Sequence, residues 1–259
     1  MHNLALVTGA TGGLGSVITA RLIQEGYTVL ALARDAAQLA RLAEETATPG
    51  RVQPVVFDVC SPQSAWYLRM FEMVQEHGEP DLLVVAHGAA PAVMPTVALE
   101  GHRFADVMLT DVWGTFMACQ TLGAYMVRRQ HGSIVLLSSV HAHLSYPQRT
   151  AYSTAKSAIC GLARSLAIEW GVYGITTNVI LPWQVTGPRT QAFMDEAKAQ
   201  GYDLEEAYQQ RSPMRRLITP GEVADAVVFL VRNRAMNGCE LVLDGGVSQS
   251  MWYKPFLGT

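Results

Sequence analysis

Short, nearly continuous apolar runs alternate with longer amphipathic segments along most of the chain. Strands that are apolar on both faces are typical of a parallel sheet covered by helices on both sides. This alternation predicts a doubly wound α/β fold with about seven strands, whose carboxyl ends form one ligand-binding edge. The predicted strands are 4–7, 28–33, 52–57, 81–86, 133–138, 175–180 and 239–244. The predicted helices are about 14–25, 36–46, 62–77, 103–129, 150–171 and 220–232.

Composition excludes several classes of protein. The 259 residues are 49% hydrophobic and 16% charged, which suits one globular domain over 1–259. The net charge of −3, with no basic stripe, argues against nucleic acid as a partner. The apolar runs are too short to span a bilayer, and the chain begins without a secretory pattern. Four scattered cysteines are typical of free thiols in a reducing compartment. We therefore expect a cytoplasmic protein with no membrane partner.

One segment, 186–217, breaks the alternation of strands and helices. It is more polar than its surroundings and contains two short helical patterns. Because it follows the sixth strand at the ligand-binding edge, it is predicted to be a substrate lid. An ordinary surface excursion is the alternative.

Glycines gather in the turn between the first strand and the first helix, at Gly9, Gly12, Gly13 and Gly15. Glycine permits a tight turn and lets a pyrophosphate approach the backbone at the N-terminus of the helix. The turn therefore predicts a dinucleotide cofactor, and a tight turn without a ligand is the alternative.

Arg34 stands at the end of the second strand, where an acidic residue would bind the ribose hydroxyls of the cofactor. A guanidinium can instead bind a 2′-phosphate, so NADP(H) is favoured over NAD(H), which stays possible. An Arg34 on the adenine face or in solvent is the alternative. Asp35 is predicted to cap the next helix. Asp58, after the third strand, is predicted to accept from the adenine amino group.

Six motifs resemble those of the short-chain dehydrogenase/reductase family in order and spacing. Ser139 lies thirteen residues before Tyr152, as the family pattern requires. The resemblance covers essentially the whole chain and implies a Rossmann-like fold. The glycines fit both the short branch and a longer branch that includes sugar-nucleotide epimerases, and the chain length favours the short branch. The motifs are TGATGGLG (8–15), FDV (57–59), SSV (138–140), YSTAK (152–156), NVILPWQVTGP (178–188) and LVLDGGVS (241–248).

Tyr152 and Lys156 are one helical turn apart. Reduction of a carbonyl adds a hydride to carbon and a proton to oxygen. Free tyrosine titrates near 10 and gives up its proton too reluctantly at neutral pH, but a nearby ammonium stabilises the tyrosinate. Tyr152 is therefore predicted to be the general acid in reduction and the general base in oxidation, with Ser139 stabilising the substrate oxygen. The alternative for Tyr152 and Lys156 is a solvated helical pair.

The resemblance also implies two sets of binding residues. The substrate pocket would include two histidines in the loop after Ser139, for which a polar loop is the alternative. These histidines lack a third ligand, so no metal site is predicted. The predicted substrate residues are Ser139, His141, His143, Tyr152 and Trp183. The predicted cofactor residues are Gly9, Thr11, Gly12, Gly13, Leu14, Gly15, Arg34, Asp58, Val59, Ala86, Gly88, Tyr152, Lys156, Pro182 and Val185.

Three positions depart from the family pattern. Asp111 stands where an asparagine usually supports a water relay to the lysine. An ionised aspartate accepts hydrogen bonds but cannot donate them. Asp111 is predicted to join the catalytic set, and three roles stay open: pairing with Lys156 through water, a weakened relay, or a helix kink. His87 is predicted to be structural or to lie on the adenosine side. Trp183 replaces a glycine and is predicted to wall the pocket.

These features predict an oxidoreductase that transfers a hydride between a nicotinamide cofactor and a ketone or secondary alcohol. The alternatives are a dinucleotide-binding sensor or scaffold with weakened catalysis, and a non-redox epimerase or dehydratase. The expected partner is a small-molecule substrate. The resemblance implies a homotetramer or homodimer, formed through the helices at 103–129 and 150–171 and the last strand. The aromatic tail at 248–259 is predicted to pack on a neighbouring subunit or on its own.

Overall fold

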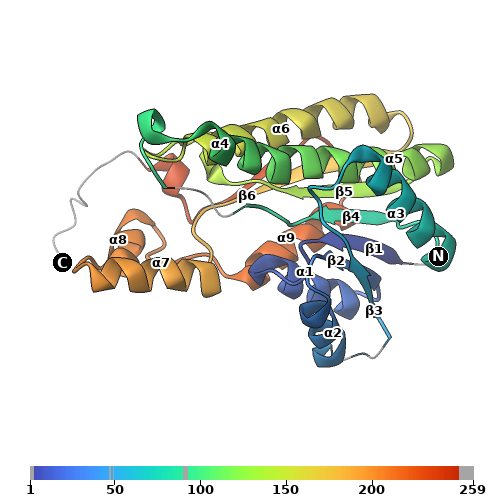
Figure 1. Ribbon diagram of the computed structural model, residues 1–259, viewed down its shortest axis with the longest axis horizontal. Coiled ribbons are helices and arrows are strands. Elements are labelled where there is room, and N and C mark those ends of the chain that lie inside the picture. The colour runs from blue at the N-terminus through green and yellow to red at the C-terminus, as the bar shows by residue number, and fades with distance from the viewer. Residues whose placement is uncertain (1–2, 47, 49, 90–92, 251–259) are drawn as a thin grey trace.

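A parallel sheet runs through the centre of the protein (Figure 1). The computed structural model describes residues 3–46, 48, 50–89 and 93–250. In this part of the chain the sheet has seven strands in the order β3-β2-β1-β4-β5-β6-β7, which confirms the predicted doubly wound, Rossmann-like fold. The strands are β1 (Leu4–Thr8), β2 (Thr28–Ala33), β3 (Val52–Val56), β4 (Leu82–Val85), β5 (Gly132–Leu137), β6 (Ile175–Pro182) and β7 (Glu240–Leu243).

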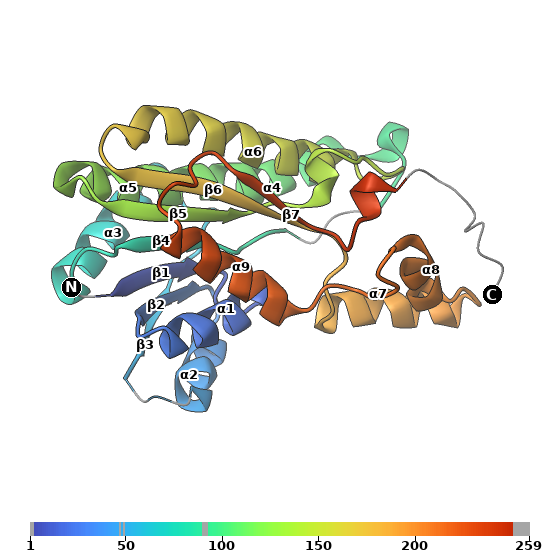
Figure 2. The same ribbon diagram turned by 180° about the vertical axis from the view of Figure 1, so that it is seen from behind.

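Helices cover both faces of the sheet, as Figures 1 and 2 show from opposite sides. On one face, α1 (Gly13–Gln24), α2 (Ala36–Glu45) and α9 (Pro220–Arg232) form an aliphatic core with the strands. On the other, α3 (Gln63–His77), α5 (Gly114–Arg129) and α6 (Thr150–Gly171) form a core richer in methionine around Trp66. The continuous apolar character of the strands follows from this burial on both sides.

Helix boundaries follow local capping chemistry. The Asp35 carboxylate accepts from the backbone N–H groups of Ala37 and Gln38, which confirms its predicted role as the cap of α2. Thr219 and Glu222 form a reciprocal capping box at the start of α9.

The long helix predicted over 103–129 is interrupted. It begins as α4 (Gly101–Val107), continues through a π-helical segment (Met108–Trp113), and then becomes α5. Two carbonyls in this segment accept side-chain hydrogen bonds. The Thr110 oxygen lies 3.1 Å from a ring nitrogen of His87, and the Asp111 oxygen lies 2.5 Å from the Thr115 hydroxyl. A π-turn adds a residue to a helical turn, and such turns are frequent at functional sites.

The segment 186–217 contains α7 (Pro188–Ala199) and α8 (Leu204–Arg211), where the sequence predicts two short helical patterns. Figures 1 and 2 show both helices projecting beyond the carboxyl ends of the strands. Most of the predicted C-terminal tail, residues 251–259, lies outside the described residues. Within the described ranges, no helix is long and apolar enough to cross a membrane.

Candidate active site

The glycine-rich turn after β1 is shaped by close backbone contacts. Gly9 has φ +65°, and a Cβ there would lie 2.7 Å from the His87 backbone. A Cβ at Gly15 would lie 2.1 Å from the Gly9 oxygen. These two positions therefore exclude larger residues on packing grounds. A Cβ at Gly13 would meet only Pro188, at 3.7 Å, so the start of α1 leaves room for a ligand.

The other predicted cofactor residues follow the neighbouring strands. Arg34 and Asp58 are exposed after β2 and β3. Burial raises the pKa of the Cys60 thiol, and the positive charge of Arg34 partly opposes that rise. Arg34 is therefore within electrostatic range of the loop after β3, which contains Cys60. The first turn of α1 includes or directly follows Thr11, Gly12, Gly13 and Leu14. Val59 is buried, and its carbonyl accepts from the Trp66 ring N–H. The Ala86 backbone N–H donates to the Thr8 carbonyl.

Val185 joins the start of the segment 186–217 to the chain that follows this segment. It forms a parallel bridge with Ile218, and its carbonyl accepts from the Thr190 hydroxyl at 2.5 Å. Pro182, at the end of β6, accepts a long hydrogen bond from Ser139. Both residues therefore lie at the same edge of the sheet as the glycine turn.

A buried ion pair lies at the centre of this edge. The Lys156 ammonium is 2.9 Å from an Asp111 carboxylate oxygen, and their side chains are 6% and 0% exposed. The other Asp111 oxygen accepts from the Ala89 backbone N–H at 2.6 Å. The pairing is therefore direct, whereas a contact through water is one of the three roles that the sequence leaves open. A Cβ at Gly88 would lie 3.5 Å from the Lys156 ammonium, so the ion pair packs against the loop after β4.

The ion pair keeps Lys156 charged. Burial alone would lower the pKa of Lys156, but the Asp111 carboxylate and Tyr152 outweigh it, and the pKa is raised. The ammonium also lies 5.4 Å from the centre of the Tyr152 ring.

Ser139 follows the end of β5, at the same edge of the sheet. Its hydroxyl donates to the Pro182 carbonyl at 3.4 Å and accepts from the His141 backbone at 3.3 Å. The preceding Ser138 instead donates to the Lys156 carbonyl at 2.8 Å and so fastens β5 to α6. Of the two adjacent serines, Ser139 has the weaker internal bonds and is better suited to bind a ligand.

His141 lies between two tyrosines. Its ring is 5.3 Å from the Tyr152 ring and 4.8 Å from the Tyr146 ring. Burial, assisted by the charge of Arg149, lowers the pKa of His141 to about 4, so the imidazole is neutral at physiological pH. Its Nδ1 atom is buried and has no partner among the described residues.

The other predicted substrate residues lie in different surroundings. Trp183 is buried between Val140 and Val247, and its ring meets that of Tyr208 on α8 at 5.7 Å. The His143 ring instead lies 2.6 Å from Glu240 of β7, and its side chain is 51% exposed. The structure thus brings Trp183 to the lid but directs His143 to the edge strand.

His87 supports the site without facing it. A carbonyl can only accept, so His87 Nε2 donates to Thr110, and Nδ1 then accepts from the Thr8 hydroxyl at 2.7 Å. The residue keeps some exposed surface, but both of its ring nitrogens are enclosed by these contacts. Burial lowers the pKa of His87 to about 4 against the opposing effect of Asp111. His87 therefore has a structural role, joining β1 to the π-helical segment.

Sequence reasoning missed four residues around the lid. Arg149 immediately precedes α6, and its guanidinium lies 5.8 Å from the Phe193 ring of α7. Arg211 of α8 donates to the Tyr146 hydroxyl at 3.0 Å, and Tyr208 meets Trp183. The position of Arg149, three residues before Tyr152, was a usable signal. No sequence signal pointed to the residues on α7 and α8.

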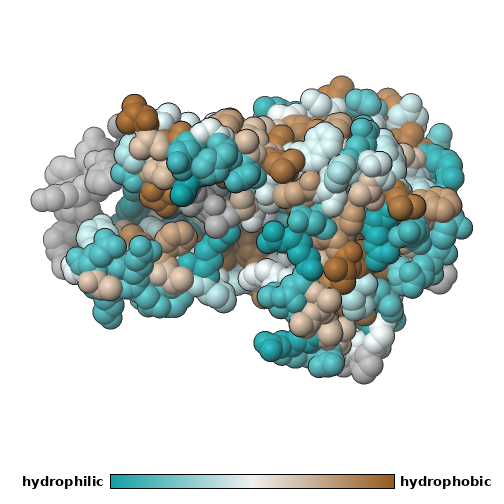
Figure 3. All heavy atoms as spheres, in the orientation of Figure 1, coloured by the Kyte–Doolittle hydropathy of each residue, from teal (hydrophilic) through white to brown (hydrophobic). Residues whose placement is uncertain are grey.

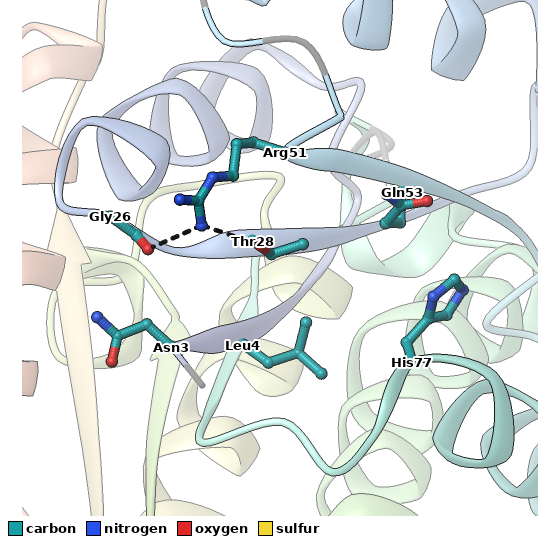
Figure 4. A pocket seen from close by; sticks show the side chains of 7 residues that line it. All are labelled: Asn3, Leu4, Gly26, Thr28, Arg51, Gln53 and His77. Atoms are coloured by element: carbon teal, nitrogen blue, oxygen red, sulfur yellow. Dashed lines mark hydrogen bonds between the residues drawn. The ribbon is translucent and has the colours of Figure 1, made fainter. Parts of the chain in front are cut away.

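A polar recess lies at the opposite edge of the sheet (Figure 4). There the Arg51 guanidinium donates to the Gly26 carbonyl at 3.3 Å and to the Thr28 hydroxyl at 3.2 Å. Because the recess is at the amino ends of β1 and β2, it is separated from Tyr152 by the length of the sheet.

Comparison with known proteins settles the family. A family model described as enoyl-(acyl carrier protein) reductase matches residues 9–248. The chain belongs to the short-chain dehydrogenase/reductase family. Its members act as NAD(P)-dependent oxidoreductases on CH–OH and C=O groups, which confirms the predicted enzyme class. The chain is also 32% identical over 260 residues to 2-(R)-hydroxypropyl-CoM dehydrogenase of Xanthobacter autotrophicus, covering 95% of this chain and 98% of that one.

Solved structures support the cofactor class. A gluconate 5-dehydrogenase from Burkholderia cenocepacia, in complex with NADP and tartrate, is similar with a TM-score of 0.88 and 25% identity over 96% of both chains. An NAD+-bound xylitol dehydrogenase has a TM-score of 0.88 and 25% identity over 95% of this chain and 98% of that one. These neighbours support a nicotinamide cofactor in the family site. The glycine turn of this chain fits such a cofactor, because it leaves the N-terminus of α1 uncrowded.

Proposed function

We propose that the enzyme interconverts a ketone and a secondary alcohol, with NADP(H) as the preferred cofactor and Tyr152 exchanging the proton. The observation that carries this proposal is the buried ion pair that holds the Lys156 ammonium beside Tyr152. When bound, the nicotinamide supplies or accepts the hydride. In reduction, Tyr152 gives its proton to the carbonyl oxygen, and Ser139 donates a hydrogen bond to that oxygen. Lys156 stabilises the resulting tyrosinate, and Asp111 keeps Lys156 charged.

A panel of ketones and secondary alcohols tests this reaction. We expect one alcohol to form for each NADPH oxidised, since a ketone, NADPH and a proton give an alcohol and NADP+. A non-redox epimerase or dehydratase would leave the nicotinamide absorbance unchanged. A sensor or scaffold would bind the cofactor without turnover of any panel member, and either outcome would contradict the proposal.

The preference for NADP(H) rests on Arg34. Its guanidinium is exposed at the end of β2, while Asp35 is occupied as a helix cap. In the Arg34→Ala variant we expect the dissociation constant of NADPH to rise roughly 10- to 100-fold, because a charge-assisted contact to phosphate is lost, while that of NADH changes little. Tighter binding of NADH than of NADPH to the wild type would refute this preference.

We also propose that 186–217 acts as a lid and that the protein is a homotetramer or homodimer, in the cytoplasm. The assembly is supported by an apolar surface along α4, the π-helical segment and α6, on which Leu109 is 42% exposed. Ile168 of α6, Val172 after it and Val242 of the edge strand β7 are also exposed apolar residues. Light scattering after gel filtration should give a smaller assembly for Leu109→Asp than for Val97→Asp, an exposed control. Equal masses would place the interface elsewhere.

A further inference from the structure

Around the lid, arginine side chains contact aromatic rings, whereas several acidic side chains are exposed to solvent. Figure 3 shows a hollow between the lid, at the left of the view, and the body of the molecule. Two arginines contact aromatic rings across this region. Arg149 lies 5.8 Å from the Phe193 ring, and Arg211 lies 4.7 Å over the Tyr146 ring. Both arginines are half-buried. Partial burial is costly for the Arg149 cation unless a negative group compensates it.

Three acidic residues of the lid are exposed to solvent. Glu205 and Glu206 of α8 are exposed, and they accept from Gln209 and Gln210 one helical turn away. Asp195 of α7 is exposed in the same way. Among the described residues, no carboxylate lies within ion-pair distance of Arg149. Within the described part of the chain, the Arg149 charge is therefore not paired with an acid of the lid.

Arg149 is close to the reacting groups. It stands at the N-cap position of α6, three residues before Tyr152 in the sequence, and its side chain makes no capping hydrogen bond. Its charge acts on two neighbouring rings. Burial lowers the pKa of His141 and Arg149 lowers it further, while burial raises the pKa of Tyr208 and Arg149 opposes that rise. The guanidinium is therefore within electrostatic range of the loop after β5 and of α8, while it contacts Phe193 of α7.

His141 supplies an independent sign of a ligand. Only 9% of its surface is exposed, and its buried Nδ1 has no partner among the described residues. Aromatic rings of Tyr146 and Tyr152 flank it. A buried polar atom without a partner costs free energy unless a bound group satisfies it.

We propose that the substrate is an anion: a short ketone or secondary alcohol whose carboxylate, phosphate or sulfonate group binds Arg149 beneath the lid. Arg211 is the second cation of this subsite, and the reacting oxygen lies at Ser139 and Tyr152. The proposal rests on the function proposed above and names the substrate class of the same site. Arginine suits this task because its planar fork matches anionic oxygens.

Matched substrates test the proposal. The kcat/KM of the enzyme with NADPH is measured for 4-oxopentanoate and for its neutral amide, 4-oxopentanamide. We expect the acid to be preferred roughly 10- to 100-fold, the range for a charge-assisted contact, and the ratio to fall towards one in Arg149→Gln. Arg149→Lys should keep part of the preference. Arg215→Gln, an exposed arginine after α8, is the control and should keep the wild-type ratio. Acetonylphosphonate and 2-oxopropanesulfonate then show which anionic group is best.

A binding measurement separates this proposal from the proposed reaction. Pentanoate and pentanamide are titrated by calorimetry into the NADPH complexes of Tyr152→Phe and of Tyr152→Phe/Arg149→Gln. Tighter binding of pentanoate that depends on Arg149 supports the anion subsite, even if no ketone is reduced and the proposed reaction fails. Reduction of neutral and anionic ketones at equal kcat/KM, unaffected by Arg149→Gln, overturns the subsite and leaves the reaction standing. Equal binding of pentanoate and pentanamide also overturns it.

Discussion

The buried region around Asp111 and the lid region around Arg149 lie at the same edge of the sheet but are built differently. In the buried region, the ion pair and the backbone bond to Ala89 provide partners within the protein for charged groups. In the lid region, arginines lie on aromatic rings, and Arg149 has no carboxylate partner among the described residues. The first region is organised before any ligand binds, while the second leaves interactions for a substrate to complete.

This difference has energetic consequences. Removing one partner from a buried ion pair leaves an uncompensated charge and costs about 3–5 kcal/mol. A contact between a cation and an aromatic ring at a partly exposed site contributes only about 0.5–1 kcal/mol. Changes in the buried region should therefore reduce stability, whereas changes in the lid should mainly alter substrate recognition.

The largest expected effect on stability is that of Asp111→Ala. It should lower the free energy of unfolding by about 3–5 kcal/mol, because Lys156 is left buried without its partner. Asp111→Asn should cost less, since its amide oxygen can still accept from Ala89. Urea denaturation measures both, with the exposed Asp106→Ala as a control expected to stay within about 0.5 kcal/mol of wild type. A loss for Asp111→Ala no larger than the control's would contradict the buried ion pair.

Asp111→Asn should also change the pH dependence of the reaction. Asp111 raises the pKa of Lys156, so its removal lets the ammonium lose its proton at lower pH. The rate, which needs that charge beside Tyr152, should then decline at a lower pH than in the wild type. A profile of kcat/KM against pH measures this. An unchanged profile would mean that Asp111 does not control the charge of Lys156.

An intermediate effect is expected for His87. Because its folded pKa is lowered from 6.5 to about 4, the unfolded chain binds more protons between these values. Stability should therefore fall as pH drops from about 6.5 to 4, and His87 should account for about 1–3 kcal/mol of this loss. His141 acts in the same direction, so His87→Gln should flatten the profile in part. Denaturation at several pH values tests this, and an equal slope in the variant would argue against it.

The smallest effect on stability is expected for Tyr208→Ala in the lid. Losing the contact with Trp183 should cost no more than about 1 kcal/mol, while KM for the best ketone should rise several-fold. Tyr202→Ala, at an exposed position before α8, is the matched control and should leave KM unchanged. If Tyr208→Ala lost as much stability as Asp111→Ala, the lid would be part of the core, and the two regions would not differ as described.

The sequence predicts the buried region better than the lid for physical reasons. Tyr152 and Lys156 are singled out by their helix spacing, and Ser139 by the resemblance to the family pattern. In the structure Lys156 lies beside the Tyr152 ring, and His141 contacts both Tyr152 and Ser139. The direct contact of Asp111 with Lys156 depends on a π-helical segment, which a 3.6-residue periodicity does not describe.

Other contacts depend on residues far apart in the chain. His143 turns towards Glu240, 97 residues away, and no local pattern indicates that pairing. Arg149 and Phe193 of α7 likewise meet, at 5.8 Å, although they are far apart in the sequence. Strand positions and local spacing thus predict the proton-handling groups, whereas the groups that contact substrate depend on tertiary placement.

The most direct test of the central claim compares wild type with Tyr152→Phe. Their single-turnover rates are measured on the best ketone of the panel, together with the dissociation constant of NADPH. Because the variant lacks the hydroxyl that exchanges the proton, its rate should fall roughly 10²- to 10⁴-fold, while NADPH still binds with similar affinity. A Tyr152→Phe enzyme that reduces the ketone at the wild-type rate would contradict the account.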